Sequence, residues 1–585
     1  MINERNIPIS TPSEVITTTI LINGTPVPQT IGTLGIQVVK EVNRIPFAKL
    51  RMKDGSAADE DFPISGGELF IPGNEIEIQV GYNSDENTIF KGIITKQALK
   101  TRRNSASELV VECRDKVYKM TLNRNSKYFY NLKDSELCDQ LIGDHGLESG
   151  DVEETSFENK RLVQVHATDW DFLLTRADTN NKLLLVDDGT LSLKKPDMSS
   201  DPVLNLTYGA NIFEFEAELD GRSQYTEVEG QSWDNTSLEL MDLEANDPGV
   251  TEQGNLSSSD LASSTGVDKF MLKHGGQLKT DELQSWIDSK LMRIKLSKIK
   301  GRVSFQGFAD VKPGALIELN GLGDRFNGKA FVSSVNHDIS RGGWTTNVQF
   351  GLDENWFAQS MKDVMDKPAS AVVPGVNGLQ IGIVTALEGD PEGEFRIKVK
   401  IPMISSQDEG IWTRVATLDA GKNRGLFFMP EIGDEVVVGF LNDDPRDAIV
   451  LGMLNSSSKP APFDPRDDNN EKGYVSREEL KVVFNDDEKS IDIKTPNGNS
   501  LVLSDQDGSI SLKDENGNSI TLDSSGITLE SANDLILKAT GNLKAEGGTN
   551  IELKANLQLK AEASAAAELN SNGTMTVKGA IVQIN

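Results

Sequence analysis

Residues 527–582, divided into blocks of eight, read ITLESAND LILKATGN LKAEGGTN IELKANLQ LKAEASAA AELNSNGT MTVKGAIV. Apolar side chains occupy the first and third positions of every block, and the fifth residue is always small. Because side chains i and i+2 of a strand point to the same face, each octad predicts one short strand followed by a tight turn. The small fifth residues are Ser531, Ala539, Gly547, Ala555, Ala563, Ser571 and Gly579.

A stack of such octads cannot stand alone, because each unit has only two inward side chains and leaves both strand edges unpaired. A single-chain β-helix needs roughly twenty residues for one coil, so we predict that three chains wind around one axis. A coiled coil is excluded, because apolar residues at positions 1 and 3 of 8 match neither a 3.5- nor a 3.6-residue period. The predicted core of this trimer shaft consists of Ile527, Leu529, Leu535, Leu537, Leu543, Ile551, Leu553, Leu559, Leu569, Met575 and Val577.

Two positions test the predicted turn. A bulky residue at Gly547 or Ala555 would place three large side chains at one level of the stack. Lys544 belongs to the outer surface in this interpretation. We therefore expect bulky substitutions at the fifth position to lower thermal stability more than the same change at Lys544.

The composition narrows the classes of function. The 585 residues allow three to five domains, and 37% of them are hydrophobic, which suffices for packed cores. After Phe484 there is no aromatic residue, His or Cys, so the tail lacks the usual general bases and thiol nucleophiles. The net charge of −31, tripled in a trimer, argues against nucleic acid and against spontaneous binding to anionic membranes. Any passage through a membrane would have to be driven mechanically.

The sequence also bears on the site of synthesis. The stretch that begins at Met1 has no apolar signal region, and no run of residues is long and apolar enough to predict a membrane-spanning helix. We expect synthesis in the cytoplasm without a signal peptide. Cys113 and Cys138 are predicted to be buried and reduced. Release from the cell would therefore need another route.

The chain is predicted to be mainly β. Helical periodicity favours helices near Ser135–Gly146, Asp169–Asn180, Asp281–Lys300 and Asn355–Asp366, the third with a cap at Thr280 or Asp281. Turn residues within Lys182–Leu193 predict a hairpin. The stretch Ala245–Val267 is predicted to be a surface loop. The predicted domains are a first hub β-barrel (1–125), a mixed helical region (126–300), completion of a second hub barrel with a connecting helix (301–367), an OB-fold barrel (368–455), a neck (456–480) and the triple-stranded β-helix (481–585).

The OB prediction depends on five short strands within some eighty residues. Pro430 and Gly433 turn the chain into a buried strand, and Asp444 with Pro445 turns it out again. The predicted strands are Gln380–Leu387, Arg396–Ile401, Ile411–Val415, Glu435–Leu441 and Ala448–Leu454.

These features together resemble the VgrG-type spike proteins of contractile injection systems, over essentially the whole chain. The stretches Val165–Leu174 and Asn336–Thr346 look like hub motifs of that family. The tail lacks the family's Val-Gly repetition, and the neck is too short for the lysozyme domain of some phage spikes. The hub motif residues are Asp169, Trp170, Phe172, Gly343 and Trp344; those similar to the OB-domain signature are Trp412, Arg414, Gly425, Phe428, Pro430, Gly433, Asp434, Val436, Phe440, Asp444 and Pro445.

The resemblance implies a non-enzymatic homotrimer that centres a baseplate on a tube and punctures a membrane. The implied partners are tube and baseplate proteins, a PAAR-like tip protein and effector cargo, and the implied route is release in the injection particle. Ile581, Val582 and Ile584 form either a tip-docking platform or the last coil of the repeat. Type VI secretion, an extracellular particle and a phage all remain open as the parent machine.

No cofactor or metal is expected. Two alternative functions, a cell-wall hydrolase and a trimeric adhesin or fibre, would each require further sequence features. The four His residues, His145, His166, His274 and His337, are scattered and are predicted to be structural. A spike-linked cell-wall hydrolase would need an acidic pair in a cleft. A trimeric adhesin or fibre would be expected to carry a receptor-binding head and an export signal.

Overall fold

The structure is a computed structural model that describes residues 15–103, 105–340 and 343–584. Residues 1–14, on which the expected absence of a signal peptide depends, lie outside the described residues, as do Arg341 and Gly342 of the second hub stretch. The chain divides into two compact units. The first comprises the residues up to Leu379 with Gly439–Ala448, and the second comprises Gln380–Val438 and the residues from Ile449 onward.

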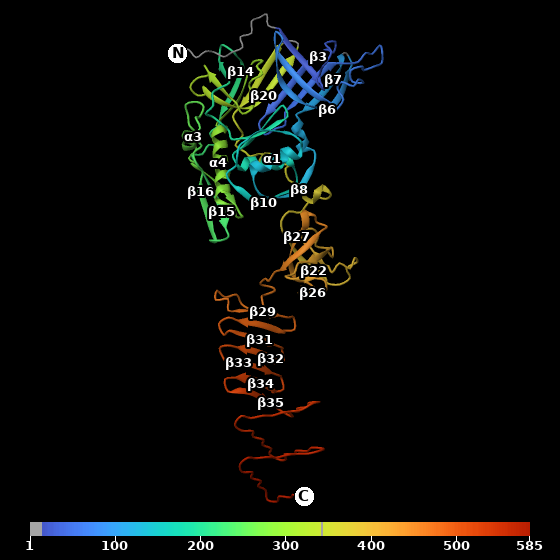
Figure 1. Ribbon diagram of the computed structural model, residues 1–585, viewed down its shortest axis with the longest axis vertical. Helices are drawn as coiled ribbons and strands as arrows, with labels where there is room; N and C mark the ends of the chain where they lie inside the picture. The colour runs from blue at the N-terminus through green and yellow to red at the C-terminus, as the bar shows by residue number, and fades with distance from the viewer. Residues whose placement is uncertain (1–14, 104, 341–342, 585) are drawn as a thin grey trace. The chain divides into compact units, whose positions relative to one another are not determined.

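One sheet of thirteen strands dominates the first unit (Figure 1). Its main path runs β14-β18-β21-β20-β3-β4-β7-β6-β5-β1-β2, and β19 with β13 joins it beside β20. The strands are β1 (Ile16–Ile22), β2 (Thr25–Pro26), β3 (Thr33–Glu41), β4 (Phe47–Lys53), β5 (Glu75–Tyr82), β6 (Asp85–Arg102), β7 (Ser105–Arg114), β13 (Leu204–Thr207), β14 (Ile212–Leu219), β18 (Ile299–Gln306), β19 (Leu316–Asn320), β20 (Gly328–Ser340) and β21 (Gly343–Phe350).

The two predicted hub barrels are halves of this continuous sheet. Ser334–Ser340 of β20 pairs antiparallel with Gly35–Glu41 of β3, so the sheet passes without a break from one half to the other. Each half encloses its own apolar core: Leu50, Ile78 and Phe90 belong to one, and residues of β18 to β21 such as Val348 belong to the other. The alternating apolar side chains of each strand supply these cores.

A mixed region joins the halves. Its helix α2 (Asp169–Thr179) begins where the Thr168 hydroxyl accepts a hydrogen bond from the Asp171 amide at 3.0 Å. The helix packs its apolar face against α1 in a third core. The other elements are η1 (Lys116–Thr121), β8 (Arg124–Lys133), α1 (Asp134–Asp144), β9 (Glu148–Val152), β10 (Glu158–Thr168), β11 (Leu183–Asp187) and β12 (Thr190–Lys194).

The longest helix, α4 (Thr280–Ser297), packs on a small sheet of order β16-β15-β17. Lys279 precedes it and makes no side-chain cap bond, so the predicted cap at Thr280 or Asp281 is wrong. The predicted loop at Ala245–Val267 contains a helix, which Ser257 begins with a capping box. The other elements are β15 (Glu227–Asp234), β16 (Glu239–Glu244), α3 (Ser258–Thr265), β17 (Lys269–His274), α5 (Phe357–Ser360) and η2 (Pro368–Ala371).

A polar junction lies where the β11–β12 turn meets the large sheet. The Lys40 ammonium forms ion pairs with Asp187 and Asp188 of the turn. The buried Asp115 carboxylate accepts hydrogen bonds from the Val117 and Gly189 amides at 3.0 and 2.8 Å. Burial raises the pKa of Asp115 to about 6. These contacts tie the turn to the first half of the sheet.

The OB prediction is confirmed strand by strand. Five strands close a barrel in the order β22-β23-β24-β28-β27. Val384, Val399, Val436, Val438 and Val450 are each at most 1% exposed and form its core. The elements are β22 (Gln380–Ala386), β23 (Ile397–Lys400), β24 (Ile411–Val415), β25 (Ala420–Gly421), β26 (Arg424–Gly425), β27 (Glu435–Phe440), η3 (Leu441–Asp443) and β28 (Ala448–Met453).

A seven-stranded antiparallel meander follows, with its strands stacked in sequence order (Figure 1). Each strand has five residues, and Asn-Gly or Asp-rich turns connect the strands from β30 to β34. Of the described helices, none is long and apolar enough to span a membrane. The meander strands are β29 (Glu471–Val475), β30 (Lys481–Asn485), β31 (Ser490–Lys494), β32 (Ser500–Ser504), β33 (Ser509–Lys513), β34 (Ser519–Asp523) and β35 (Gly526–Glu530).

Candidate functional site

The candidate site is one face of the meander, where two ladders of apolar side chains run across the strands. Strand register places Leu501 opposite Ile493 and Leu512, and Leu503 opposite Ile491 and Ile510. Because side chains alternate between faces, all of these residues share one face. The ladders are Val482-Ile493-Leu501-Leu512-Ile520-Leu529 and Phe484-Ile491-Leu503-Ile510-Leu522-Ile527.

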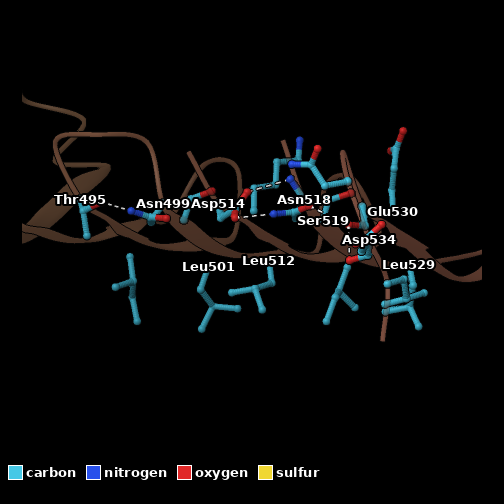
Figure 2. A pocket seen from close by; sticks show the side chains of 17 residues that line it. Thr495, Asn499, Leu501, Leu512, Asp514, Asn518, Ser519, Leu529, Glu530 and Asp534 are labelled. Atoms are coloured by element: carbon cyan, nitrogen blue, oxygen red, sulfur yellow. Dashed lines mark hydrogen bonds between the residues drawn. The ribbon is translucent and has the colours of Figure 1, made fainter. Parts of the chain in front are cut away.

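This apolar face is open. Ten of its twelve ladder side chains keep between 37% and 72% of their surface exposed. Side chains of the first ladder line a groove of about 630 Å³, and Figure 2 shows Leu501, Leu512 and Leu529 projecting from the same side of the sheet. A contiguous apolar surface of this kind marks an interaction site. The arrangement can bury two ladders per chain as soon as equivalent faces meet.

Hydrogen-bonded turns hold one edge of the meander in register (Figure 2). Asp514 accepts from the Asn518 amide and side chain, both at 2.7 Å, and these bonds lower the pKa of Asp514. The Asn518 side-chain oxygen accepts in turn from Ser531 and Ala532 at 3.0 Å. The Asn499 side-chain oxygen likewise accepts a hydrogen bond from the Glu515 amide at 3.2 Å. The sequence predicts Asn and Gly turns here but not these hydrogen bonds, although Asn-Gly-Asn-Ser occurs at both 497–500 and 516–519.

The octad segment continues from this face. Its backbone bends once every eight residues from Ala532 to Ile581, so the predicted repeat is present in the backbone itself. The bends fall on the sixth and seventh positions, such as Gly548-Thr549, and the predicted position at the fifth residue is one residue too early. Within described residues 531–584, no strand pairs with another part of the same chain. The core positions from Leu535 to Val577 are 52–87% exposed.

The apolar residues at the C-terminal end of the octad segment are exposed as well. Ile581, Val582 and Ile584 are 81%, 49% and 90% exposed in the single chain. Within described residues 531–584, none of these three residues belongs to a paired strand.

The residues of the OB signature build the barrel and its turns. Val436 is fully buried and Phe440 is half-buried, whereas Phe428 is 53% exposed. At Gly425, φ is +131°, and an added Cβ would lie 2.4 Å from the Asp419 carbonyl, so only glycine fits. The remaining positions are Trp412 and Arg414 on β24, Pro430, Gly433 and Asp434 in the turn before β27, and Asp444 and Pro445 in the turn before β28.

Two ion pairs fix the ends of that barrel. The Lys459 ammonium lies 2.8 Å from Asp434; burial alone would raise the pKa of Asp434, but the hydrogen bonds from Lys459 and the Glu431 amide, with the charge of Lys459, together outweigh burial and lower it. Arg446 contacts Asp444 at 2.7 Å across the turn before β28 and lowers the pKa of that carboxyl to about 2. Both are structural contacts.

The first hub stretch builds the start of α2. Asp169 accepts hydrogen bonds from Asn125, Gln164 and His145 at 2.8–3.0 Å. Burial alone would raise the pKa of Asp169, but these bonds outweigh it and lower the pKa. The next residue but two, Phe172, stacks on Phe129 with ring centroids 5.8 Å apart. Trp170 is buried in the third core.

Trp344 follows Gly343 at the start of β21 and packs into the core of the first half of the sheet, not the second. It stacks on Tyr82 at 5.4 Å, and its indole nitrogen donates to His337 at 3.4 Å. His337 is buried, and its pKa is lowered to about 3. Trp344 therefore connects the two halves.

The other candidate chemical groups have structural surroundings. Cys113 and Cys138 are free and buried, and burial raises the pKa of both thiols, to about 12 for Cys138. His166 lies 3.8 Å from Asp366, and His274 accepts from the Gly276 amide. In residues 15–103, 105–340 and 343–584, no group of three His, Cys, Asp or Glu residues is placed to hold a metal ion.

Three protein families match successive parts of the chain. Residues 12–341 match the Alg8 N-terminal domain, residues 380–454 the type VI secretion system/phage-baseplate injector OB domain, and residues 490–585 the phage baseplate V C-terminal trimerisation domain. The first match covers more than half of the chain. The third covers most of the apolar ladders and all of the octads.

Curated relatives match over shorter stretches. The type VI secretion system spike protein VgrG1a of Pseudomonas aeruginosa is 28% identical over 148 residues, 24% of this chain and 22% of the relative. The spike protein VgrG3 of Vibrio cholerae is 33% identical over 97 residues, 15% of this chain and 10% of the relative. The chain thus spans about a fifth or less of each of these relatives.

Among solved structures, the 43 kDa tail protein of prophage MuSo2 from Shewanella oneidensis aligns with a TM-score of 0.45 at 12% identity, covering 58% of this chain and 99% of that protein. Because the Alg8 N-terminal domain match covers more than half of the chain, the chain belongs to that family, and the OB and trimerisation matches with the VgrG relatives support a VgrG-type spike protein.

Proposed function

We propose that the chain is the structural hub and spike of a contractile injection system and that it works as a homotrimer. The observation that carries this proposal is the open apolar face of the meander, which the octad segment continues without any strand partner inside the described chain. The match to a trimerisation domain at residues 490–585 supports three copies. Three equivalent faces turned toward one axis would bury all six ladders.

The energetics favour this assembly. Fully burying a Leu or Ile side chain contributes about 1.5–3 kcal/mol, so burying the exposed half of one ladder residue contributes about 1 kcal/mol. The gain repeats over every ladder and octad residue in three chains. Bending the resulting shaft would break many backbone hydrogen bonds at once, which suits a part that transmits axial force.

The acidic charge fits a driven rather than a spontaneous contact with membranes. A trimer carries three times the −31 of one chain, and like charges repel anionic lipid surfaces and nucleic acid. We therefore assign membrane puncture to the force of contraction. The large hub sheet would contact the tube and baseplate, and the OB barrel would act as a collar.

The proposed tip partner is a PAAR-like protein with effector cargo, held by the apolar platform of Ile581, Val582 and Ile584. Three such platforms would meet where the shaft ends. The alternative of a simple last coil predicts no partner. Copurification of a tip protein with the full chain, but not with a variant carrying Ser at these three positions, separates the two.

We propose a structural rather than a catalytic role. The relatives named above are spike proteins, although another match carries the name actin cross-linking toxin VgrG1 of Vibrio cholerae, of which this chain spans 13%. Asp169 with His145, a carboxylate and base pair, is engaged in positioning α2. Zymography on peptidoglycan tests the hydrolase alternative, and clearing of the substrate would overturn the structural role.

Light scattering of the purified full chain tests the oligomeric state. We expect a mass three times the 63.8 kDa of one chain. Deleting Ile527–Asn585 should leave a chain that assembles poorly into a working injector. A monomer of the full chain in dilute buffer would refute the proposal.

A further inference from the structure

A small hairpin projects from the OB barrel between β24 and β27. Its two strands pair Ala420 with Gly425, and the Leu426 amide donates to the Asp419 carbonyl at 3.0 Å. An ion pair of 2.5 Å between Arg424 and Asp419 braces it. The hairpin is thus ordered within the single chain, without help from a partner.

Leu418 and Phe427 flank the paired residues at the base of the hairpin. Both side chains are almost bare, at 95% and 77% exposed. Two large apolar side chains left in solvent lose the stabilisation of burial, so a cover for them is expected.

The segment that follows the hairpin contacts the meander through Phe428. The Phe428 ring lies 4.9 Å from the ring of Tyr474 on β29. Tyr474 pairs with Val482, so it belongs to the first apolar ladder. Arg477, in the turn after β29, forms a 3.0 Å ion pair with Glu431 and fixes the loop at the same level. The hairpin therefore lies over the first strands of the face that three copies would bury.

Leu418 and Phe427 lie beside this contact in the sequence and are largely exposed in the single chain. At this level each copy also exposes Leu480, just before β30, and Phe484 on β30, at 49% and 47%. In a cyclic trimer, one patch of a protomer meets a different patch of the next protomer. The hairpin and the β29–β30 turn are two such patches.

We propose that Leu418 and Phe427 of each copy pack on the β29–β30 turn, around Leu480, of the neighbouring copy. The proposed occupant is a second copy of this chain, because the hairpin is continuous with the trimer-forming face through the contact of Phe428 with Tyr474. The inference rests on the proposed trimer and adds an interlock that begins above the shaft. Each hairpin is held between its own sheet and that of a neighbour.

Cysteine cross-linking of the full chain tests the interlock. The double variant Leu418→Cys with Leu480→Cys is treated with a short bis-maleimide and run on a denaturing gel. Both positions are exposed in the single chain, so the changes leave the protomer fold intact. Cys113 and Cys138 are buried and their thiol pKa values are raised, so they stay unmodified.

We expect the gel band to shift to three times the 63.8 kDa of one chain, because each copy links to the next. One cysteine per chain can join only two chains. The matched control pairs Leu480→Cys with Met403→Cys, since Met403 is 85% exposed and follows β23, whose end pairs with the start of β24, whereas the hairpin follows the end of β24. We expect the control to stay at the mass of one chain.

The outcomes are distinct. A product confined to one chain would mean that the hairpin covers its own turn and would overturn the inference. Two-chain products from Leu418→Cys alone, with no three-chain product from the double variant, would mean that hairpins meet each other, which also overturns it. Light scattering of the same samples reports whether the trimer itself exists, so failure of the interlock and failure of the proposed trimer are told apart.

Discussion

Two adjacent glycines in the octad segment are expected to respond to alanine with opposite signs. A Cβ added to Gly547 would lie 2.5 Å from the Asn550 carbonyl oxygen and 2.9 Å from a side-chain carbon of Ile551. A Cβ added to Gly548 meets nothing within 4 Å. Neither glycine has the positive φ that favours glycine, so both backbones accept alanine. The difference is therefore one of space.

The magnitude follows from two opposing terms. A backbone oxygen cannot swing away, and the shift needed to relieve such overlap costs about 1–3 kcal/mol. Replacing Gly by Ala lowers the entropy of the unfolded chain and returns about 0.4–1 kcal/mol. Gly547→Ala should thus destabilise by about 1–2 kcal/mol per copy, or about 3–6 kcal/mol in a trimer. Gly548→Ala should stabilise by about 0.4–1 kcal/mol per copy.

Thermal unfolding of the full chain, followed by circular dichroism, measures both effects. All samples need the same protein concentration, because the melting temperature of an oligomer depends on it. Lys544→Ala, on the predicted outer surface, should melt with the parent chain. Equal melting temperatures for Gly547→Ala and Gly548→Ala would refute the steric reasoning about this turn.

Three further predictions concern the hub, and tryptophan fluorescence in urea can follow each. Asp115 has a folded pKa of about 6 against an unfolded value near 3.8. Its contribution to the free energy of unfolding is therefore complete below pH 3.8 and falls by about 3 kcal/mol as the pH rises through 6. Asp115→Asn should remove this pH dependence, and an unchanged pH dependence would exclude Asp115 as its source. His337 has a folded pKa lowered to about 3, so its contribution is complete above pH 6.5, and acidification from pH 7 to 5 should cost about 2 kcal/mol, a loss absent from His337→Gln. Asp178→Ala should lower the free energy of unfolding by about 3–5 kcal/mol, because it leaves the buried Arg293 without its carboxylate partner. Removal of the exposed Asp247 carboxylate should lower it by less than about 1 kcal/mol. Comparable losses would contradict the role given to burial.

The sequence predicts local structure best where burial and turn chemistry agree. The strand Ile411–Val415 is predicted to the residue, and the other four OB strands to within one residue at each end. Each of these strands alternates apolar and polar side chains between residues that favour turns. The apolar positions of the octads likewise identify the uncovered face before any contact is known.

Sequence patterns do not predict features that depend on contacts between residues far apart in the sequence. The pairing of β20 with β3 joins residues some three hundred positions apart, and no local pattern reports it. This pairing also explains why Trp344 packs in the core of the first half of the sheet, although its strand β21 belongs to the second half. The polar stretch before Gly266 reads as loop, yet a capping box at Ser257 begins a helix there. In the candidate site, the hydrogen bonds of Asn518 depend on which turns stack, which only the strand register decides.

The change of pairing at Glu530 has a consequence for assembly. Strands β29–β35 pair with neighbours about ten residues away, and such local contacts form early. From residue 531 to 584 the described chain offers no partner of its own, so octad strands can pair only after three copies have met. The meander must therefore fold first and bring the copies together through its ladders. Refolding should show a fast phase that is independent of protein concentration, followed by a slower phase that accelerates with concentration; a single concentration-independent phase would show that the octads find partners within one chain.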